Sequence, residues 1–134
     1  MTRAEPFRFR LDHSTGVPVY RQIIDQLQLA IASGALGGGQ QLPTVRQVAV
    51  DLAINPNTVM RAYRELEIRG TLTTQQGLGT FVTPSSVKED DAQRQSRLSR
   101  LAADCASRAG AEGFSIRNLV ERLTELLSEK DHRR

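Results

Sequence analysis

Two helix starts lie close together near the middle of this chain and restrict the folds that it can adopt. Thr44-Val-Arg-Gln47 forms the first start, because a threonine and a glutamine at this spacing cap a first turn reciprocally. A short amphipathic segment and a brief break follow. Asn55-Pro56 then forms the second start, with asparagine as the cap and proline in the first helical position. The spacing therefore predicts two short helices joined by a tight turn.

Helical periodicity extends to both sides of this turn. Pro18 opens a longer helix whose apolar residues recur three and four positions apart, and Gly34 ends it. The helix that begins at Pro56 has one apolar face and ends at Gly70. Its buried positions are predicted to be Val59, Ala62, Tyr63 and Leu66.

Short strands are predicted at two places. Residues 72–74 and 80–82 suit strands, and the glycine-rich residues 75–79 suit the tip of a hairpin between them. Near the N-terminus, Phe and Arg alternate over residues 7–11, which predicts another short, half-buried strand. Helix, short helix, tight turn, helix and hairpin is the order of a winged helix-turn-helix, in which the third helix enters the major groove of DNA.

The remaining residues predict a helical tail. The residue composition changes at about residues 84–88, so we expect a winged helix-turn-helix domain over 1–84 and a tail over 85–134. The predicted fold class is α+β and mainly α. One tail helix should span roughly 88–109 and end at Gly110, and a second should begin after Ser115. Two such helices are too small to close a core alone, so their apolar stripes must meet the first domain or, as we favour, a second chain. The residues expected to dimerise are Leu98, Leu101, Cys105, Ile116, Leu119, Val120, Leu123, Leu126 and Leu127.

Length and composition exclude several classes of protein. The chain has 134 residues and a formal charge of +3, which suits one domain with a small appendage and favours a polyanionic partner only weakly. No window is apolar enough for a membrane span and no signal peptide is apparent, so we expect a cytoplasmic protein with no membrane partner. Aromatic residues make up 4% of the chain, which disfavours a base-stacking platform for single strands.

Enzyme chemistry has little support in the sequence. Asp12-His13-Ser14 holds three residue types of a catalytic triad, but adjacent residues cannot orient one another in those roles, so this segment is predicted to be a turn. The glycine run 37–39 lacks the Gly-Lys-Ser/Thr of a phosphate-binding loop. Cys105 is most simply a small apolar residue, with redox sensing as the alternative. We therefore expect no enzyme activity, no cofactor and no metal site.

Five ordered motifs resemble the DNA-binding domain of GntR-family bacterial transcription regulators, and the YtrA subfamily in particular. These motifs are Leu42–Ala49, Asn55–Val59, Arg61–Tyr63, Glu65–Glu67 and Gly77–Val82. The resemblance implies a homodimer that binds a palindromic double-stranded operator, most often as a repressor of its own operon, with transporter genes among the targets. Met60 stands where the family often has a basic residue, and Gln75-Gln76 stands where Lys or Arg is common.

Candidate DNA contacts lie at the starts of the two central helices. A positive charge is unfavourable at a helix N-terminus, so Arg46 is better explained by a phosphate or a guanine edge than by the helix itself. Asn57 can pair with adenine, and Thr58 can touch a thymine methyl group or a phosphate, although both residue types also serve as helix caps. Arg61 lies one turn later on the same polar face, with an ion pair to Glu65 as its alternative role.

Weaker candidates lie farther along the third helix and in the hairpin. We expect Arg64 to contact the DNA backbone rather than a base. Glycine in the hairpin allows a tight turn and a close backbone approach to DNA, but any hairpin has that need. The hairpin candidates are Gln75, Gln76, Gly77, Gly79 and Thr80.

A winged-helix module for protein–protein interaction is the alternative function. It would need an apolar or acidic face on the third helix, whereas this helix presents Asn57, Thr58, Arg61 and Arg64. The sequence leaves open whether a small-molecule effector exists. The tail is too short to enclose a ligand within one chain, so an effector is expected at the dimer interface or between the domains.

Overall fold

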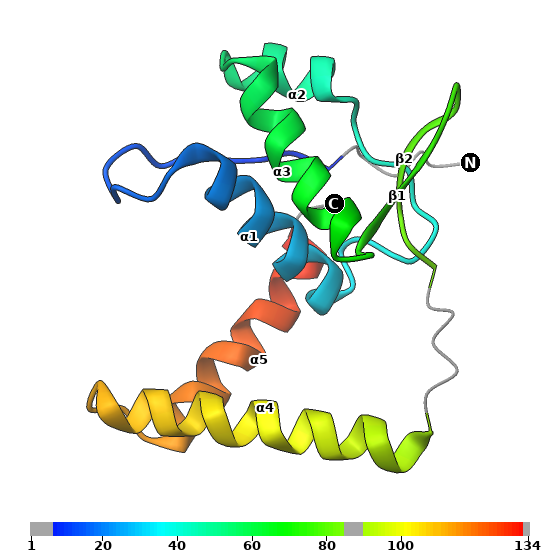
Figure 1. Cartoon of the computed structure of the whole chain (residues 1–134). Helices are drawn as coiled ribbons and strands as arrows, with labels where there is room; N and C mark the ends of the chain where they lie inside the picture. The colour runs from blue at the N-terminus through cyan, green and yellow to red at the C-terminus, as the bar shows by residue number, and fades with distance from the viewer. Residues whose placement is uncertain (1–6, 85–89, 133–134) are drawn as a thin grey trace. The chain divides into compact units, whose positions relative to one another are not determined.

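The computed structural model describes residues 7–84 and 90–132, which fall into two compact units. The first unit holds three helices and a β-hairpin, and the second holds two helices (Figure 1). The predicted mainly helical α+β class is confirmed.

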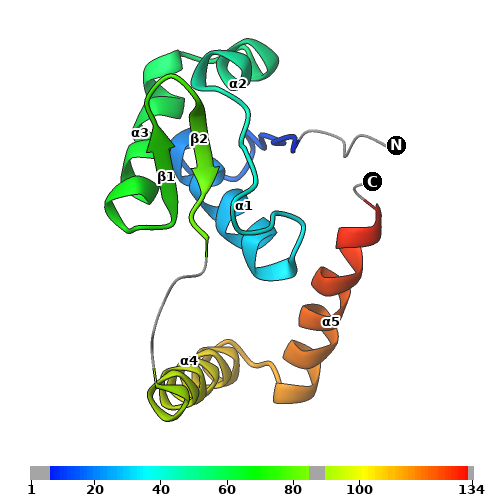
Figure 2. The same ribbon diagram turned by 90° about the vertical axis from the view of Figure 1, so that its right-hand side faces the viewer.

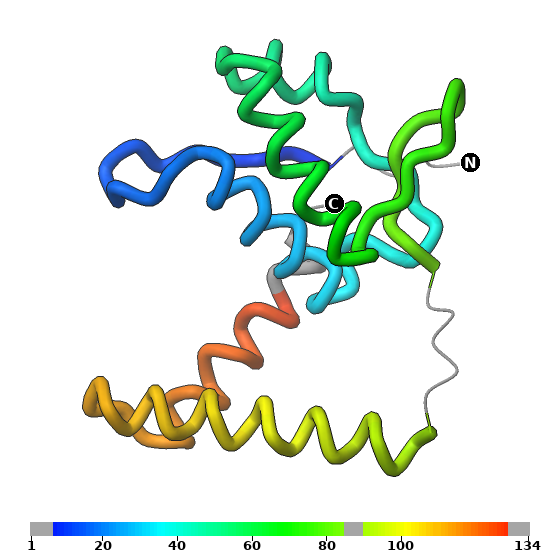
Figure 3. The backbone as a smooth tube through the Cα atoms, viewed as in Figure 1, coloured from blue at the N-terminus to red at the C-terminus, as the bar shows by residue number. Residues whose placement is uncertain are grey.

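The first unit is built around its third helix. Helices α1 (Val19–Ser33) and α2 (Val45–Leu52) both pack against α3 (Pro56–Ile68). Strands β1 (Leu72–Gln75) and β2 (Gly79–Val82) follow α3 directly and form an antiparallel hairpin, whose backbone path is clearest in Figure 3. This is the winged helix-turn-helix order that the sequence predicts.

One apolar core joins the three helices to the hairpin. The four predicted core positions of α3, Val59, Ala62, Tyr63 and Leu66, are all buried, as are apolar residues of α1, α2 and both strands. The Tyr63 hydroxyl donates a hydrogen bond of 2.6 Å to the Pro43 carbonyl oxygen, so its polar end is satisfied inside the core. Burial raises the pKa of Tyr63, because the charged phenolate is poorly solvated there.

Both predicted helix starts are confirmed. The backbone N–H of Gln47 donates to Thr44 Oγ1, and the backbone N–H of Thr44 donates to Gln47 Oε1. Asn55 Oδ1 accepts from the backbone N–H of Asn57 at 2.9 Å, with Pro56 as the first helical residue. Ala53 makes the turn between α2 and α3 in the left-handed region, with φ of 55°, which is uncommon for a residue with a side chain.

The hairpin is longer than predicted and has an extra neighbour. Gln75 pairs with Gly79, so each strand gains a residue and the tip shortens to residues 76–78. On the other edge of β2, Leu42 N–H donates to the Thr80 carbonyl, and Val82 N–H donates to the Gln40 carbonyl. The segment before α2 therefore braces the hairpin, although no alternation in its sequence indicates a strand.

The strand predicted over residues 7–11 is absent, and this prediction was wrong. Phe9 is buried and meets Phe7 edge-on, so the apolar alternation is used, but the segment lies beside a helix rather than a sheet. Its backbone bonds to glutamine amides of α1. The N–H and C=O of Arg10 pair with the Gln26 side chain, and those of Asp12 pair with the Gln22 side chain. Residues 12–15 then turn as predicted, with Asp12 Oδ1 accepting from the Ser14 N–H.

The second unit consists of α4 (Asp91–Ala111) and α5 (Ile116–His132). The predicted helix end at Gly110 was wrong: this glycine lies inside α4, and the chain reverses at Gly113, with φ of 88°. The predicted helix start at residue 88 lies outside the described residues, and Asp90 caps α4. Ser115 caps α5 as predicted, because its Oγ accepts from the Asn118 N–H at 3.0 Å.

Candidate nucleic-acid interface

The first turn of α3 is exposed and carries no negative charge. Asn57 is exposed and Thr58 is half-buried. Among the described residues the Asn57 side chain has no hydrogen-bond partner, because the Asn55 side chain performs the capping. A helix N-terminus with its positive dipole end open to solvent favours anions. The capping alternative for Asn57 therefore does not apply, and its amide is available to a ligand.

Charge is segregated along α3. Its two carboxylates lie in the second half and have local partners: Glu65 pairs with Arg69 at 3.6 Å, and Glu67 Oε1 accepts from the Thr74 hydroxyl at 2.6 Å. The alternative role of Arg61, an ion pair with Glu65, is thus not formed. The half of α3 that precedes these residues is neutral or positive, which suits a phosphate backbone.

Arg61 is held by an aromatic ring rather than by a carboxylate. Its guanidinium carbon lies 3.7 Å from the centroid of the Tyr20 ring, which belongs to α1. Stacked in this way, a guanidinium keeps its N–H donors directed sideways toward solvent. Sequence reasoning missed Tyr20 as part of the site, because its place in the apolar stripe of α1 explains the residue equally well.

The other two arginines of this surface differ in how they are held. Arg46 is exposed in the first turn of α2, and its side chain has no hydrogen bond or ion pair among residues 7–84 and 90–132. Nothing in the fold of α2 therefore explains a positive charge at this position. Arg64 is also exposed and makes one weak contact, 3.8 Å from its Nη2 to the sulfur of Met60.

The hairpin tip is exposed and internally braced. Gln75, Gln76 and Gly77 are exposed, whereas Gly79 and Thr80 are half-buried. The Thr80 hydroxyl lies 3.2 Å from that of Thr74. Gln41 was missed by sequence reasoning: its Nε2 donates to the Leu78 carbonyl at 2.9 Å and occupies the space that a side chain at position 79 would need.

The structure brings these candidates to one end of the first unit. In Figures 1 and 2 the N-terminus of α3, helix α2 and the tip of the hairpin all lie toward the upper end of that unit. The positive ends of two helix dipoles and an extended hairpin therefore share a surface. Such a surface can receive a negatively charged, grooved ligand.

In the second unit, the residues predicted to dimerise remain largely open to solvent. Six of them expose between 49% and 65% of their surface, namely Leu98, Leu101, Ile116, Val120, Leu123 and Leu127, and the other three, Cys105, Leu119 and Leu126, are half-buried. Among residues 90–128, whose side chains the structure describes, only Ala109 is buried. An apolar face of this extent calls for a covering partner.

Comparison with known proteins fits this geometry. The sequence model of the bacterial regulatory proteins, gntR family, matches residues 19–82. YtrA from Sulfolobus acidocaldarius, a GntR-family transcription factor, superposes with a TM-score of 0.55 at 30% identity, over 90% of this chain and 97% of that one. The chain belongs to the GntR family.

Other GntR comparisons define how far the likeness extends. The repressor YtrA from Bacillus subtilis is 38% identical over 77 residues, which cover 58% of this chain and 59% of that protein. The chain thus spans 59–61% of the length of three curated relatives and 14–32% of five others. A transcriptional antiterminator from Listeria monocytogenes has a TM-score of 0.69 at 23% identity, over 92% of this chain, and so shares the fold. Within the described residues, no helix of this GntR protein is long and apolar enough to cross a membrane.

Proposed function

We propose that this protein is a sequence-specific, double-stranded-DNA-binding transcription repressor. The observation that carries the proposal is the first turn of α3, where Asn57 is exposed and free because a different asparagine caps the helix. An amide at this position can pair with adenine in the major groove. The repressor role is supported by the YtrA relative, which is named a repressor.

The contacts divide into two classes. Asn57, Thr58 and Arg61 are proposed to face base edges and nearby phosphates, because they lie on the first turns of the recognition helix. Arg46 and Arg64 are proposed to contact phosphates, and the hairpin residues Gln75, Gln76, Gly77, Gly79 and Thr80 to approach the minor groove or the backbone.

The tail is proposed to join two chains. Its open apolar face supports a homodimer, and a two-fold dimer of this motif binds palindromic half-sites about 34–36 Å apart, or a multiple of that spacing. We propose residues 1–84 as the DNA-binding domain and 85–134 as the dimerisation domain and candidate effector-response region. The proposed targets are the repressor's own operon and, with it, transporter genes.

Fluorescence anisotropy tests this function directly. The protein is titrated onto its own upstream intergenic DNA and onto a scrambled duplex, each at two salt concentrations. We expect binding that prefers the natural sequence and weakens steeply with salt. Arg46→Ala should weaken binding to both duplexes and lower the salt slope by about 1.

Asn57→Ala tests the recognition of bases separately from the attraction between charges. It should weaken binding to the natural duplex by about 5- to 150-fold, which corresponds to ~1–3 kcal/mol, and should leave the scrambled duplex almost unaffected. Arg117→Ala is the matched control, because this exposed arginine lies on α5, in the other unit. If the wild type and all three variants failed to bind either duplex, even at low salt, the DNA-binding function would be rejected in favour of protein–protein interaction.

A further inference from the structure

The two helices of the second unit leave an open groove between them. Its volume is about 800 Å³, and its floor is apolar, formed by residues such as Leu101, Cys105, Ala109 and Leu119. A groove of this kind on an exposed unit needs an occupant. The charges around the groove indicate the chemistry of that occupant.

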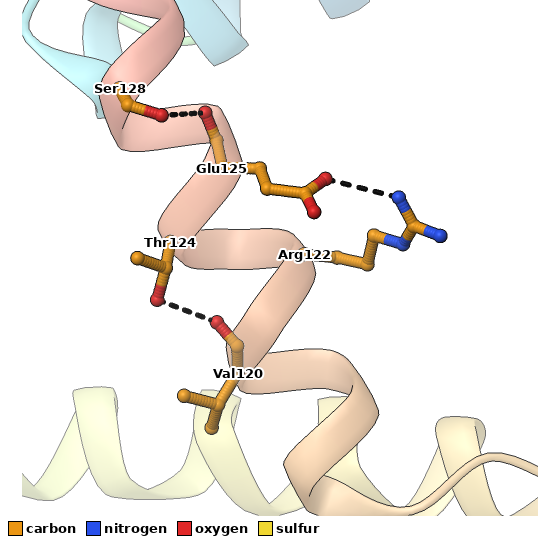
Figure 4. A network of polar contacts seen from close by, with 5 residues as sticks. All are labelled: Val120, Arg122, Thr124, Glu125 and Ser128. Carbon is orange, nitrogen blue, oxygen red and sulfur yellow. Dashed lines mark hydrogen bonds and ion pairs between the residues drawn. The ribbon is translucent and has the colours of Figure 1, made fainter.

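The rim of the groove is acidic. Four carboxylates, those of Asp104, Glu112, Glu121 and Glu125, line it together with two guanidiniums, an excess of two negative charges. Arg122 Nη1 lies 3.0 Å from Glu125 Oε2, so one acid and one base of the rim already pair with each other, and the excess of negative charge falls on the remaining carboxylates (Figure 4). We therefore expect an occupant that is apolar in the middle and basic at its edges.

The N-terminal half of α4 has that character. A second hollow on the same helix is lined by Arg94, Arg97 and Arg100, with Leu98 and Leu101 between them and Asp104 at its end. Asp104 lines both hollows. Counted without it, this hollow holds three guanidiniums and no carboxylate, whereas the groove holds three carboxylates and two guanidiniums, so the two regions differ in the sign of their charge. Leu98 and Leu101 are 56% and 65% exposed.

One chain thus carries an apolar stripe whose charge changes sign along its length. Two copies related by a two-fold axis bring the same surface of each chain onto the other. If the two α4 helices ran parallel, the basic half of one chain would face the basic half of the other, and the two acidic grooves would face each other. If they run antiparallel, each basic half faces an acidic groove, and both contacts are favourable.

We propose that the basic half of α4 from a second copy of this chain seats in the acidic groove between α4 and α5. Leu98 and Leu101 of one chain then cover the groove floor of the other, and the arginines meet the rim carboxylates. The inference rests on the proposed homodimer and adds the direction and register of its interface.

Charge reversal tests the register. Arg94→Glu/Arg100→Glu makes both ends of the stripe acidic, and Glu121→Arg/Glu125→Arg makes both ends basic. Each double variant should raise the dimer dissociation constant by about tenfold or more in sedimentation equilibrium at low salt. The quadruple variant restores opposite ends, and its constant should return to within about threefold of the wild-type value.

The control matched to the arginine double variant is Arg8→Glu/Arg117→Glu, which has the same charge change at two exposed positions outside both hollows. Its dimer should match the wild type, and circular dichroism should show the same helix content for every variant. A quadruple variant as weak as the doubles, or doubles as strong as the control, would overturn the antiparallel register.

Two outcomes separate this inference from the proposed function. A wild-type dimer that is unaffected by the reversals, with DNA binding intact, would reject the register alone. A wild-type protein that stays monomeric at micromolar concentration would reject the second copy as the occupant, whether or not the chain binds DNA.

Discussion

The guanidinium of Arg61 on α3 lies 3.7 Å from the centre of the Tyr20 ring on α1. The contact joins two helices that also share the apolar core, so the ring is held rigidly beneath the arginine. A long side chain that is already held in place loses less entropy when it binds a ligand. We therefore expect Tyr20 to support the proposed DNA contact by holding Arg61 in place.

Replacing the ring tests this support. Tyr20→Leu should raise the dissociation constant for operator DNA by about 2- to 5-fold, which corresponds to the ~0.5–1 kcal/mol of a cation–π contact at an exposed site. Tyr20→Phe keeps the aromatic face and should bind as the wild type does in the same anisotropy titration. A phenylalanine variant as weak as the leucine variant would show that the hydroxyl, not the ring face, matters.

The turn of the helix-turn-helix carries backbone strain at Ala53, with φ of 55°. Ala53→Gly should stabilise the first unit by about 0.5–1 kcal/mol, because the ~1–2 kcal/mol cost of a side chain in this region exceeds the ~0.4–1 kcal/mol by which glycine favours the unfolded chain. Thermal unfolding measures the effect. Ala32→Gly, an exposed position within α1, is the control and should destabilise the unit. A lower unfolding temperature for Ala53→Gly would contradict the strain.

The hairpin tip depends on the absence of a side chain at Gly79. The φ of 125° is unfavourable for any other residue, and a Cβ there would lie 2.7 Å from Gln41 Nε2, so this side-chain end would have to move away from the Leu78 carbonyl to which it donates. Gly79→Ala should therefore destabilise the first unit by about 1–3 kcal/mol and weaken DNA binding. Gly37→Ala is the matched control, because its Cβ would meet nothing within 4 Å. Chemical denaturation of both variants measures the difference, and equal midpoints would refute the need for glycine at position 79.

Tyr63 links the core to the loop before α2. Tyr63→Phe leaves the Pro43 carbonyl without its 2.6 Å donor and should lower the free energy of unfolding by about 1–3 kcal/mol near neutral pH. Burial raises the pKa of Tyr63 above its ordinary value of 10.0, so its contribution is fully present below that pH and is lost as the pH rises further.

The pH dependence gives this prediction a second readout. Because phenylalanine cannot ionise, the stability difference between wild type and Tyr63→Phe should shrink as the pH is raised above 10.0. Denaturant midpoints at neutral and alkaline pH measure it. A difference that stays constant with pH would contradict a buried, protonated phenol.

Local signals in the sequence predicted most of the elements correctly. The caps at Thr44 and Asn55 act on backbone groups within three residues, so the starts of α2 and α3 could be read without knowledge of the fold. The apolar face of α3 also follows from helical periodicity. The presence of Gly110 led to a wrong prediction of the helix end. A glycine ends a helix only where the chain turns away from the helix, and here that happens at Gly113.

Which segments are helices, where they begin and which faces they bury could therefore be predicted from the sequence, because those properties depend on neighbours one or two turns away. The partners of groups that lie far apart along the chain depend instead on tertiary packing. The backbone of residues 10–12 pairs with Gln22 and Gln26 rather than with a strand, Gln41 braces the hairpin tip, and Tyr20 holds Arg61. Each of these contacts joins segments that packing brings together, and glutamine or tyrosine alone does not indicate its partner.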